Sequence, residues 1–280
     1  MNAPWRLWGR QLTGVLRLEL KKSFLSRRGW WIYLLALGPV VLTASHWLIS
    51  SRGHWGEHSL AEDNRVYAGI FQVFYLRLGI FFGCVGIFAN LFRGEILEKT
   101  LHYYLLSPLR RELLAISKYV AGLLTAIVFF GGSAGLSYVF IHLHYGPEFE
   151  EFLFQGPGLE QLGWYLLVAV LASIGYGAVF LVLGQWFGNP MIPAAVVMVW
   201  EAINSFLPPI LKKISVIFYL KSLCPVDLPP DPHGPFLSLL TLDAEPIPAW
   251  LAIPGLLVVS GAVLCYAARR ARRIEISYSE

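Results

Sequence analysis

Six long apolar runs, separated by polar segments, constrain this chain more than any other feature. They occupy about residues 30–49, 67–92, 118–141, 163–187, 191–208 and 249–268. A helix needs roughly 20 mainly apolar residues to cross a bilayer, whereas a barrel strand needs only about 9–11 alternating residues. Of the 280 residues, 56% are hydrophobic and 14% are charged. The sequence therefore predicts an all-α membrane protein, a single domain over residues 1–280 with six transmembrane helices.

The segment before the first run has the pattern of an amphipathic helix at residues 9–28. Its apolar side chains recur about every fourth position, and its cations fall on the other side. The apolar set is Leu12, Val15, Leu16, Leu20 and Phe24, and the cationic set is Arg10, Arg17, Lys21 and Arg28. This predicts a helix in the membrane interface whose cations face lipid phosphates; an ordinary cationic tail is the alternative. The run that follows exceeds the roughly 7–15 residues of a signal-peptide core, so we expect it to be a span.

The distribution of lysine and arginine predicts the orientation of the chain. With six spans, 16 of the 22 basic residues fall on the side that holds both termini, and we expect that side to be the cytoplasm. These are Arg6, Arg10, Arg17, Lys21, Lys22, Arg27, Arg28, Arg93, Lys99, Arg110, Arg111, Lys118, Arg269, Arg270, Arg272 and Arg273. The opposite side holds Arg52, Arg65, Lys212, Lys213 and Lys221, and Arg77 lies within a span.

A charged amphipathic stretch at residues 93–112, RGEILEKTLHYYLLSPLRRE, separates the second and third apolar runs. It cannot lie in hydrocarbon with its charges unpaired. We therefore predict a structured cytoplasmic surface element, of the kind that a transporter subunit presents to a motor. Its apolar side chains at helical spacing, which either pack under the spans or dock a partner, are Leu97, Leu101, Tyr104 and Leu105.

The segments on the opposite side contain short elements. Residues 209–248 are rich in proline and include two apolar pieces, residues 214–220 and 236–242, that are too short to span. We expect these pieces to be interfacial or re-entrant helices before the sixth span. The three cysteines lie in two spans and one outer segment, a distribution that gives neither a disulfide framework nor a metal motif.

Sequence motifs for catalysis are weak in this chain. No G-x-x-x-x-G-K-[ST] motif occurs, so we expect no ATP hydrolysis by the chain itself. The sequence GGSAG at residues 131–135 matches the nucleophile pattern G-x-S-x-G, which would make Ser133 the nucleophile of an intramembrane hydrolase. That pattern requires a turn between a strand and a helix. Because this one lies inside an apolar run, Gly131 and Gly135 are better interpreted as a helix-packing pair.

Histidines on the outer side are weak candidates for a metal site. His54 and His58 have the i, i+4 spacing that can hold an ion on a helix, with His142 and His144 on the same side. In a loop they would be ordinary solvated histidines, so the sequence assigns no metal site.

Two charges fall inside predicted spans. By helical rise, Arg77 lies roughly 15 Å below the outer edge of the second span, and Glu201 lies roughly 10 Å below that of the fifth. Unpaired charges at such depths are costly. Either the two side chains pair and hold two helices together, or both line a substrate pathway.

The layout and the charged stretch resemble the permease subunits of the second class of bacterial ABC exporters, which have the type V architecture. The family pattern is an acidic residue, a Thr-Leu pair, a Leu-Leu-x-Pro segment, an arginine and a lysine that opens the third span. In this chain the matching positions are Glu95, Thr100, Leu101, Leu105, Pro108, Arg110 and Lys118. Lys99 precedes the threonine, where the family often has glycine. The resemblance implies an interface helix, a coupling helix between spans two and three, and short helices before span six.

The resemblance also implies partners and a location. A separate ABC ATPase would grip the region from Glu95 to Leu106, with Glu95 and Glu98 pairing with basic residues of that motor. ATP and Mg would be bound by the ATPase, and no cofactor by this chain. The chain would form half of the pathway, beside a second copy or a sister permease, in the bacterial inner membrane. Its net charge of +4 is better explained by anionic lipid than by nucleic acid.

Other classes of function remain as alternatives at this point. A membrane scaffold or assembly protein without a transport cycle would show the same spans but would need no motor. The intramembrane hydrolase built on Ser133 lacks a histidine nearer than His142. Nothing in the sequence selects the cargo among lipids, peptides, antibiotics, polysaccharides and ions.

Overall fold

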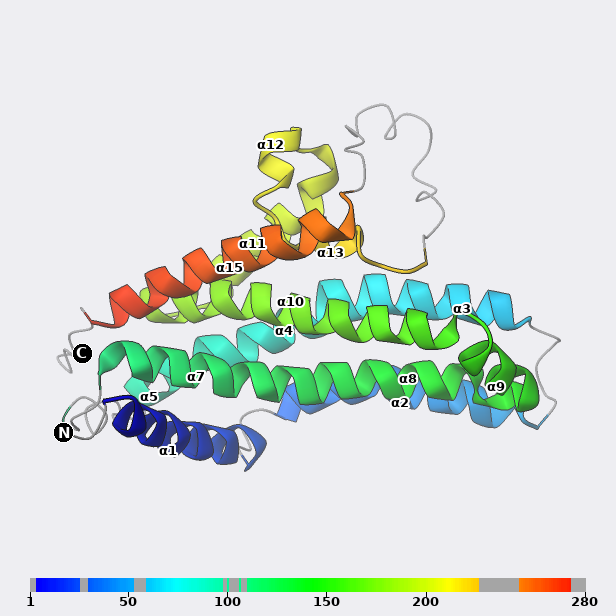
Figure 1. The fold of residues 1–280 in the computed structure, drawn as a ribbon, viewed down its shortest axis with the longest axis horizontal. Helices are drawn as coiled ribbons and strands as arrows, with labels where there is room; N and C mark the ends of the chain where they lie inside the picture. The colour runs from blue at the N-terminus through cyan, green and yellow to red at the C-terminus, as the bar shows by residue number, and fades with distance from the viewer. Residues whose placement is uncertain are drawn as a thin grey trace.

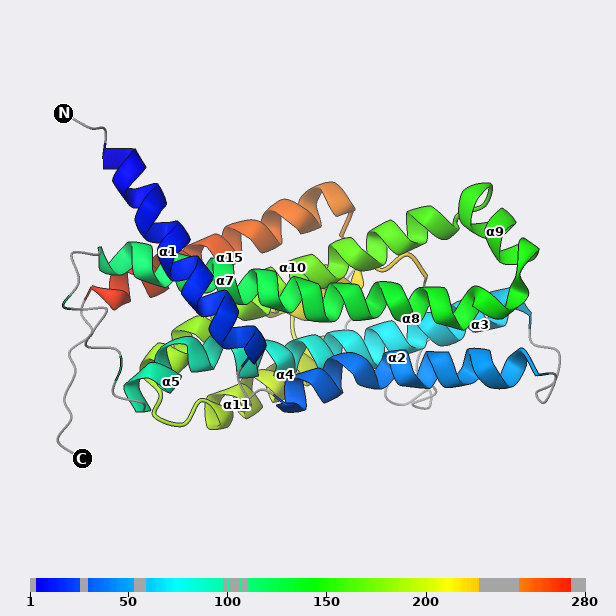
Figure 2. The same ribbon diagram turned by 90° about the horizontal axis from the view of Figure 1, so that it is seen from below.

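The chain folds into an elongated bundle of helices. The fold comes from a computed structural model, which describes residues 4–25, 30–52, 59–97, 100, 106, 110–226 and 247–272. Over these residues it contains α, π and 3-10 helices and no strand. Figures 1 and 2 show the long helices running side by side along one axis. The all-helical prediction is confirmed.

Five helical segments are long and apolar enough to cross a membrane. Two of them are continuous rods in which α-helix alternates with wider π-helical turns. The segments are α2 (Trp30–Ser50); the rod of α3 (Leu60–Gly69), η2 (Ile70–Gly79), α4 (Ile80–Cys84), η3 (Val85–Ala89) and α5 (Asn90–Leu97); the rod of α7 (Arg111–Ala126), η4 (Ile127–Gly131), α8 (Gly132–His142) and η5 (Leu143–Tyr145); α10 (Gly158–Trp186); and α15 (Ala249–Ala271).

The bundle has two distinct ends. At one of them, here the α5 end, lie α5, the start of α7, the last turn of α15 and the helix α1 (Pro4–Leu25). At the other, here the α9 end, lie the start of α3, η5, the start of α10 and the short helix α9 (Pro147–Phe154). Polar side chains that the sequence separates widely meet at both ends.

The predicted fifth span, residues 191–208, does not form one long helix. The helix α11 covers Met191–Ala202, and a 3-10 turn, η6 (Ile203–Phe206), follows it. Twelve residues of helix rise only about 18 Å, which is well short of the roughly 30 Å of hydrocarbon. After the 3-10 turn Leu207 is extended, the backbone conformation that a residue before proline favours. The prediction of six full spans is therefore not met over the described residues.

Two short helices follow α11, and the second covers most of the piece predicted at residues 214–220, whose interfacial or re-entrant position stays a prediction. They are α12 (Pro209–Lys212) and α13 (Val216–Lys221), and Figure 1 shows them beside the middle of the bundle. The helix α13 packs against α10 and α15. The second predicted piece, residues 236–242, lies outside the described residues.

The amphipathic segment at the N-terminus is a helix, with bounds shifted from the predicted 9–28 to Pro4–Leu25. It crosses α7 obliquely and packs against it (Figure 2). Val15 and Glu19 are buried in that contact, whereas Leu18 is exposed. The helix therefore uses part of its apolar face for packing on the bundle, and its place in the membrane interface stays a prediction.

Among the described glycines, Gly184 of α10 is where an added Cβ would come nearest to the backbone of another helix. A Cβ there would lie 2.5 Å from the carbonyl oxygen of Ala89 and 2.7 Å from its Cα. The predicted packing pair behaves differently: a Cβ at Gly135 would meet only Leu166, at 3.7 Å, and one at Gly131 would meet only Ile127, at 3.8 Å. Both positions have room for a methyl group, so neither is a close backbone contact between helices in the described chain, and the role of Gly131 and Gly135 in helix packing stays a prediction.

Replacing Gly184 with alanine should destabilise the bundle. The added methyl group must displace the backbone of η3, and overpacking of this kind costs about 1–3 kcal/mol. Gly163, on the same helix, has no atom within 4 Å of the corresponding position. Gly163→Ala should therefore leave the Tm unchanged or raise it, since alanine favours helix by about 1 kcal/mol over glycine. Equal Tm values for the two variants in detergent would contradict the close contact at η3.

Candidate functional site

A buried ion cluster, here the Lys118 cluster, occupies the α5 end of the bundle. The ammonium of Lys118 lies 2.5 Å from Glu19 Oε1 and 2.7 Å from Glu95 Oε1. All three side chains are almost inaccessible to solvent, at 0%, 3% and 2% exposure respectively. Glu19 comes from α1, Glu95 from α5 and Lys118 from α7. The cluster therefore links the N-terminal helix, the start of the charged stretch and the third predicted span.

The charges in the cluster depend on one another. An ammonium removed from water is stable only when anions and polar groups replace its hydration. Lys118 has two carboxylates as partners and also lies 5.6 Å from the centre of the Phe92 ring, a cation–π distance. The two carboxylates repel each other, and the ammonium of Lys118 contacts both of them. Loss of the lysine would remove the cation that both buried carboxylates contact.

Further contacts surround the cluster and bring in the C-terminal helix. The guanidinium of Arg110 lies 4.6 Å from the centre of the Trp8 ring of α1. Arg111 Nη1 donates a hydrogen bond of 2.9 Å to the carbonyl of Arg272, at the end of α15, and the guanidinium of Arg272 pairs with Glu112. Three helices that are distant in sequence, α1, α7 and α15, are therefore tied together beside the charged stretch.

The predicted coupling residues divide into three groups. The side chain of Glu95 points into the protein and pairs with Lys118, so it is not available to a motor in this arrangement. The backbone of Thr100 donates a 2.9 Å hydrogen bond to the carbonyl of Glu95, and Arg110 is exposed. The remaining predicted positions, Glu98, Leu101, Leu105 and Pro108, lie outside the described residues. Within the same stretch, Leu106 is 80% exposed.

The two charges predicted inside spans are not paired with each other. Within the described part of the chain no ion pair joins Arg77 to Glu201. The carboxylate of Glu201 instead caps the start of α13, accepting hydrogen bonds from Ser215 Oγ at 2.7 Å, Val216 N at 3.1 Å and Ile217 N at 2.9 Å. Arg77 is exposed on η2. The possibility that they form an inter-helix pair is not seen here, and the pathway role stays a prediction.

Ser133 lies inside the helix α8, not on a strand-to-helix turn. Its hydroxyl is 2.6 Å from the Tyr75 hydroxyl and donates to the carbonyl of Ala36, so it serves to hold η2, α8 and α2 together. His142 lies on the same helix, with its Nδ1 2.8 Å from the carbonyl of Tyr138. Ser133 is therefore buried within a helix and does not lie on the exposed strand-to-helix turn that a serine nucleophile needs.

The predicted histidine pair, His54 and His58, lies outside the described residues. Of the two other histidines on that side, His142 is buried, whereas His144 lies 3.5 Å from Asp63 and stacks edge-on against His46. The structure therefore brings His144 and His46 together at the α9 end, a combination that sequence spacing did not predict.

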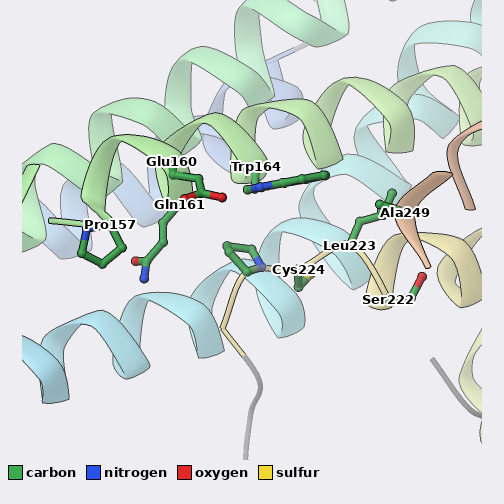
Figure 3. A pocket seen from close by; sticks show the side chains of 9 residues that line it. Pro157, Glu160, Gln161, Trp164, Ser222, Leu223, Cys224 and Ala249 are labelled. Carbon is green, nitrogen blue, oxygen red and sulfur yellow. The ribbon is translucent and has the colours of Figure 1, made fainter. Parts of the chain in front are cut away.

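A cavity of about 360 Å³ lies between the start of α10 and the segment after α13. Figure 3 shows Glu160, Gln161 and Trp164 on one wall, with Leu223 and Cys224 on the other. The Gln72 amide holds the backbone after α13 in place by donating a 2.8 Å hydrogen bond to the carbonyl of Val226. The cavity is about the smallest size that holds a drug-like ligand, and residues 227–246, outside the described part, follow directly from its wall.

Sequence reasoning missed Glu19. The periodicity of α1 placed its cations toward lipid, and a single acid on the helix drew no attention. The useful signal is that Glu19 is the one acidic residue among residues 4–25, four positions after the buried Val15. An isolated acid on the packing face of a cationic helix indicates a buried basic partner.

Removing Lys118 should be far more damaging than removing one of its partners. Lys118→Met removes the ammonium that both buried carboxylates contact, and breaking a buried pair in this way costs about 3–5 kcal/mol. Glu95→Gln keeps the pair with Glu19 and should lower the Tm less. The exposed Lys21→Met is the matched control and should leave the Tm unchanged.

A triple variant tests whether charge is the cause. Combining Lys118→Met with Glu19→Gln and Glu95→Gln removes all three charges at similar volume, and it should recover much of the Tm lost in Lys118→Met. A triple variant less stable than Lys118→Met would show that packing, not charge balance, holds this end together.

Comparison with known proteins identifies the family of the chain. Residues 15–204 match the family described as ABC-2 family transporter protein, which is more than half of the 280 residues. No curated protein matches the chain. The chain therefore belongs to the ABC-2 transporter permease family, in agreement with the resemblance seen in its charged stretch.

Proposed function

We propose that this ABC-2 family member is the permease subunit of an ATP-driven exporter and forms half of its translocation pathway. The family implies an ABC ATPase as partner, and its members are membrane subunits and not catalytic ones. The observation that carries the proposal for coupling is the Lys118 cluster. It connects the stretch on which a motor would dock to two further helices.

The cluster gives a physical route for coupling. A motor that displaces residues 93–112 also moves Glu95, the third residue of that stretch. Because Glu95 and Glu19 share the buried ammonium of Lys118, separating them would expose unpaired charges in a poorly solvated interior. The less costly response is a concerted movement of α1, α5 and α7 as one body. Two rigid arrangements biased by nucleotide binding are the usual basis of such a switch.

In this proposal Glu95 acts through Lys118 and not by direct contact with the motor. Direct contact falls to exposed side chains of the stretch, such as Leu106, together with Glu98, Leu101 and Leu105. ATP and Mg are bound by the ATPase subunit. The α5 end faces the cytoplasm of a bacterial inner membrane, as the excess of basic residues there supports.

Apolar outer surfaces support a membrane setting and a second permease copy. Large apolar side chains are exposed on α2, α11 and α15, among them Leu34 at 70%, Val196 at 66% and Val258 at 70%. Such surfaces suit lipid or a partner chain. Arg77 is exposed at the depth of a span, where hydrocarbon is unfavourable for a charge. A water-lined route between two permease chains would provide the environment that this side chain requires.

A scaffold protein without a transport cycle is the second candidate. It would keep the same spans and apolar surfaces but would not bind an ATPase. Purifying the chain from its native membrane in mild detergent, and identifying bound proteins by mass spectrometry, separates the two. A stoichiometric ATPase with a Walker A motif supports the permease, and its absence under conditions that preserve other ABC complexes supports the scaffold.

A charge placed on the exposed part of the coupling stretch should prevent capture of the ATPase. Leu106→Glu introduces an anion at a side chain that is 80% exposed, so folding should be unaffected while an apolar contact with the motor is lost. The matched control is Leu159→Glu, at a leucine that is 56% exposed at the α9 end. We expect Leu159→Glu to retain the ATPase in the same purification. Equal retention by both variants would contradict docking on this stretch.

Water should reach position 77 within the span. In a variant whose native cysteines are replaced, Arg77→Cys should react with a membrane-impermeant thiol reagent. Val41→Cys, at a side chain that is 62% exposed on the outer face of α2, should not react because lipid covers it. Protection of position 77 in the assembled complex, equal to that of position 41, would contradict a pathway role for Arg77.

A further inference from the structure

Three side chains from separate elements converge on one point at the α9 end. Asp63, in the first turn of α3, is buried, and its Oδ2 lies 3.1 Å from His46 Nε2 and 3.5 Å from His144 Nε2. His46 comes from the last turns of α2, and His144 from η5. The ligand atoms of the three residues all lie within 4.8 Å of one another. We call these residues the outer triad.

The spacing of the outer triad agrees with the geometry of a zinc site. Zinc binds histidine nitrogen at about 2.0–2.1 Å and carboxylate oxygen at about 2.0–2.2 Å in a tetrahedral arrangement, which places neighbouring ligand atoms about 3.3 Å apart. The two nitrogen–oxygen distances of 3.1 Å and 3.5 Å bracket that value. The two imidazoles stand edge-on at 76°, with ring centroids 5.4 Å apart, and each presents its Nε2 to the same oxygen of Asp63.

The surroundings also suit a metal. The Tyr145 hydroxyl donates a 3.2 Å hydrogen bond to Asp63 Oδ2, and such an outer partner orients a ligating carboxylate. The imidazoles are partly accessible, at 19% and 13% exposure, whereas the carboxylate is 4% exposed. An ion can therefore enter from solvent and still be held against a buried anion. Imidazole donors favour zinc and similar transition metals over magnesium and calcium.

If the Lys118 cluster lies at one surface of the membrane, the outer triad lies outside the hydrocarbon core at the other surface. Asp63 and Glu95 belong to one continuous rod of helix and are 32 residues apart, which is at most roughly 48 Å by α-helical rise, because the π-helical turns between them rise less per residue. The hydrocarbon core is about 30 Å thick. The outer triad is therefore placed where aqueous metal ions reach it.

We propose that His46, Asp63 and His144 form a zinc-binding site that fastens α2, α3 and η5 together at the outer end of the permease. Three protein ligands leave one coordination position for water. The ion would supply a cross-link between three helix ends whose members are 17 and 81 residues apart in sequence. This proposal does not depend on the coupling mechanism, because it concerns the opposite end of the bundle.

Zinc binding is measured on the full chain, purified in detergent on an affinity tag that contains no histidine. After stripping with EDTA and dialysis, zinc is added and the metal content and Tm are determined. We expect one zinc per chain and a rise in Tm that EDTA reverses and that magnesium does not produce. Asp63→Asn and His46→Gln should each weaken zinc binding by at least about the 10–100-fold that loss of an outer-shell partner causes.

A double variant, His54→Ala with His58→Ala, is the matched control. It removes the histidine pair with helical spacing and should retain zinc with unchanged affinity. Loss of zinc in this double variant, with retention in Asp63→Asn, would overturn the proposal. A wild-type chain that holds no zinc and shows no zinc-dependent Tm would overturn it as well, and would leave the triad as a hydrogen-bonded clasp. Since the wild-type measurement needs no substitution, a variant that fails to fold does not remove the test.

Discussion

The ammonium of Lys118 cannot be left alone in the interior of this protein, and the arrangement of the α5 end follows from that constraint. Two carboxylates, from α1 and α5, must stay beside it, because each buried charge is stable only with its counter-charge. The N-terminal helix is therefore held to the bundle by an ionic contact as well as by its apolar face. The charged stretch, residues 93–112, is attached to the same ion cluster through Glu95. A displacement of the stretch that did not also move Lys118 would break the ion cluster.

The long rod from α3 to α5 connects this constraint to the opposite end of the molecule. It carries Asp63 near one terminus and Glu95 near the other, and both carboxylates are buried and engaged with basic or imidazole groups. Between them, η2 and η3 are π-helical, with wider turns than an α-helix. The close backbone contact of Gly184 against Ala89 also falls on η3. Polar contacts thus hold the rod at both ends, and α10 packs closely against it at η3. This combination suits movement of the rod as one body.

Much of the fold follows from apolar run lengths, and the failures are where distant residues decide the outcome. Four of the six predicted spans lie within helices that are longer than the apolar run. Charged and polar residues such as Asp63 and Glu95 continue the helix beyond the run, because each has a hydrogen-bonding or charged partner. The window at residues 191–208 fails because average hydropathy does not register the change from α-helix to a 3-10 turn after Ala202 and to an extended residue before Pro208. The motif positions Glu95 and Lys118 were identified by resemblance, but their burial and the role of Glu19 depend on the packing of α1. The outer triad could not be predicted from the sequence, because its three residues lie on three different helices and share no sequence spacing.

The shortness of α11 bears on what one chain can do alone. The helix ends at Ala202, and the carboxylate of Glu201 satisfies the free backbone N–H groups at the start of α13. Helix ends at this depth are tolerated only where protein or water covers their polar groups. Arg77, also at the depth of a span, is exposed on the surface of the single chain. A lone copy in a bilayer would present this guanidinium to lipid, whereas a second permease chain, or the water between two chains, would solvate it. The polar groups that one chain leaves at membrane depth are therefore those expected of half a pathway.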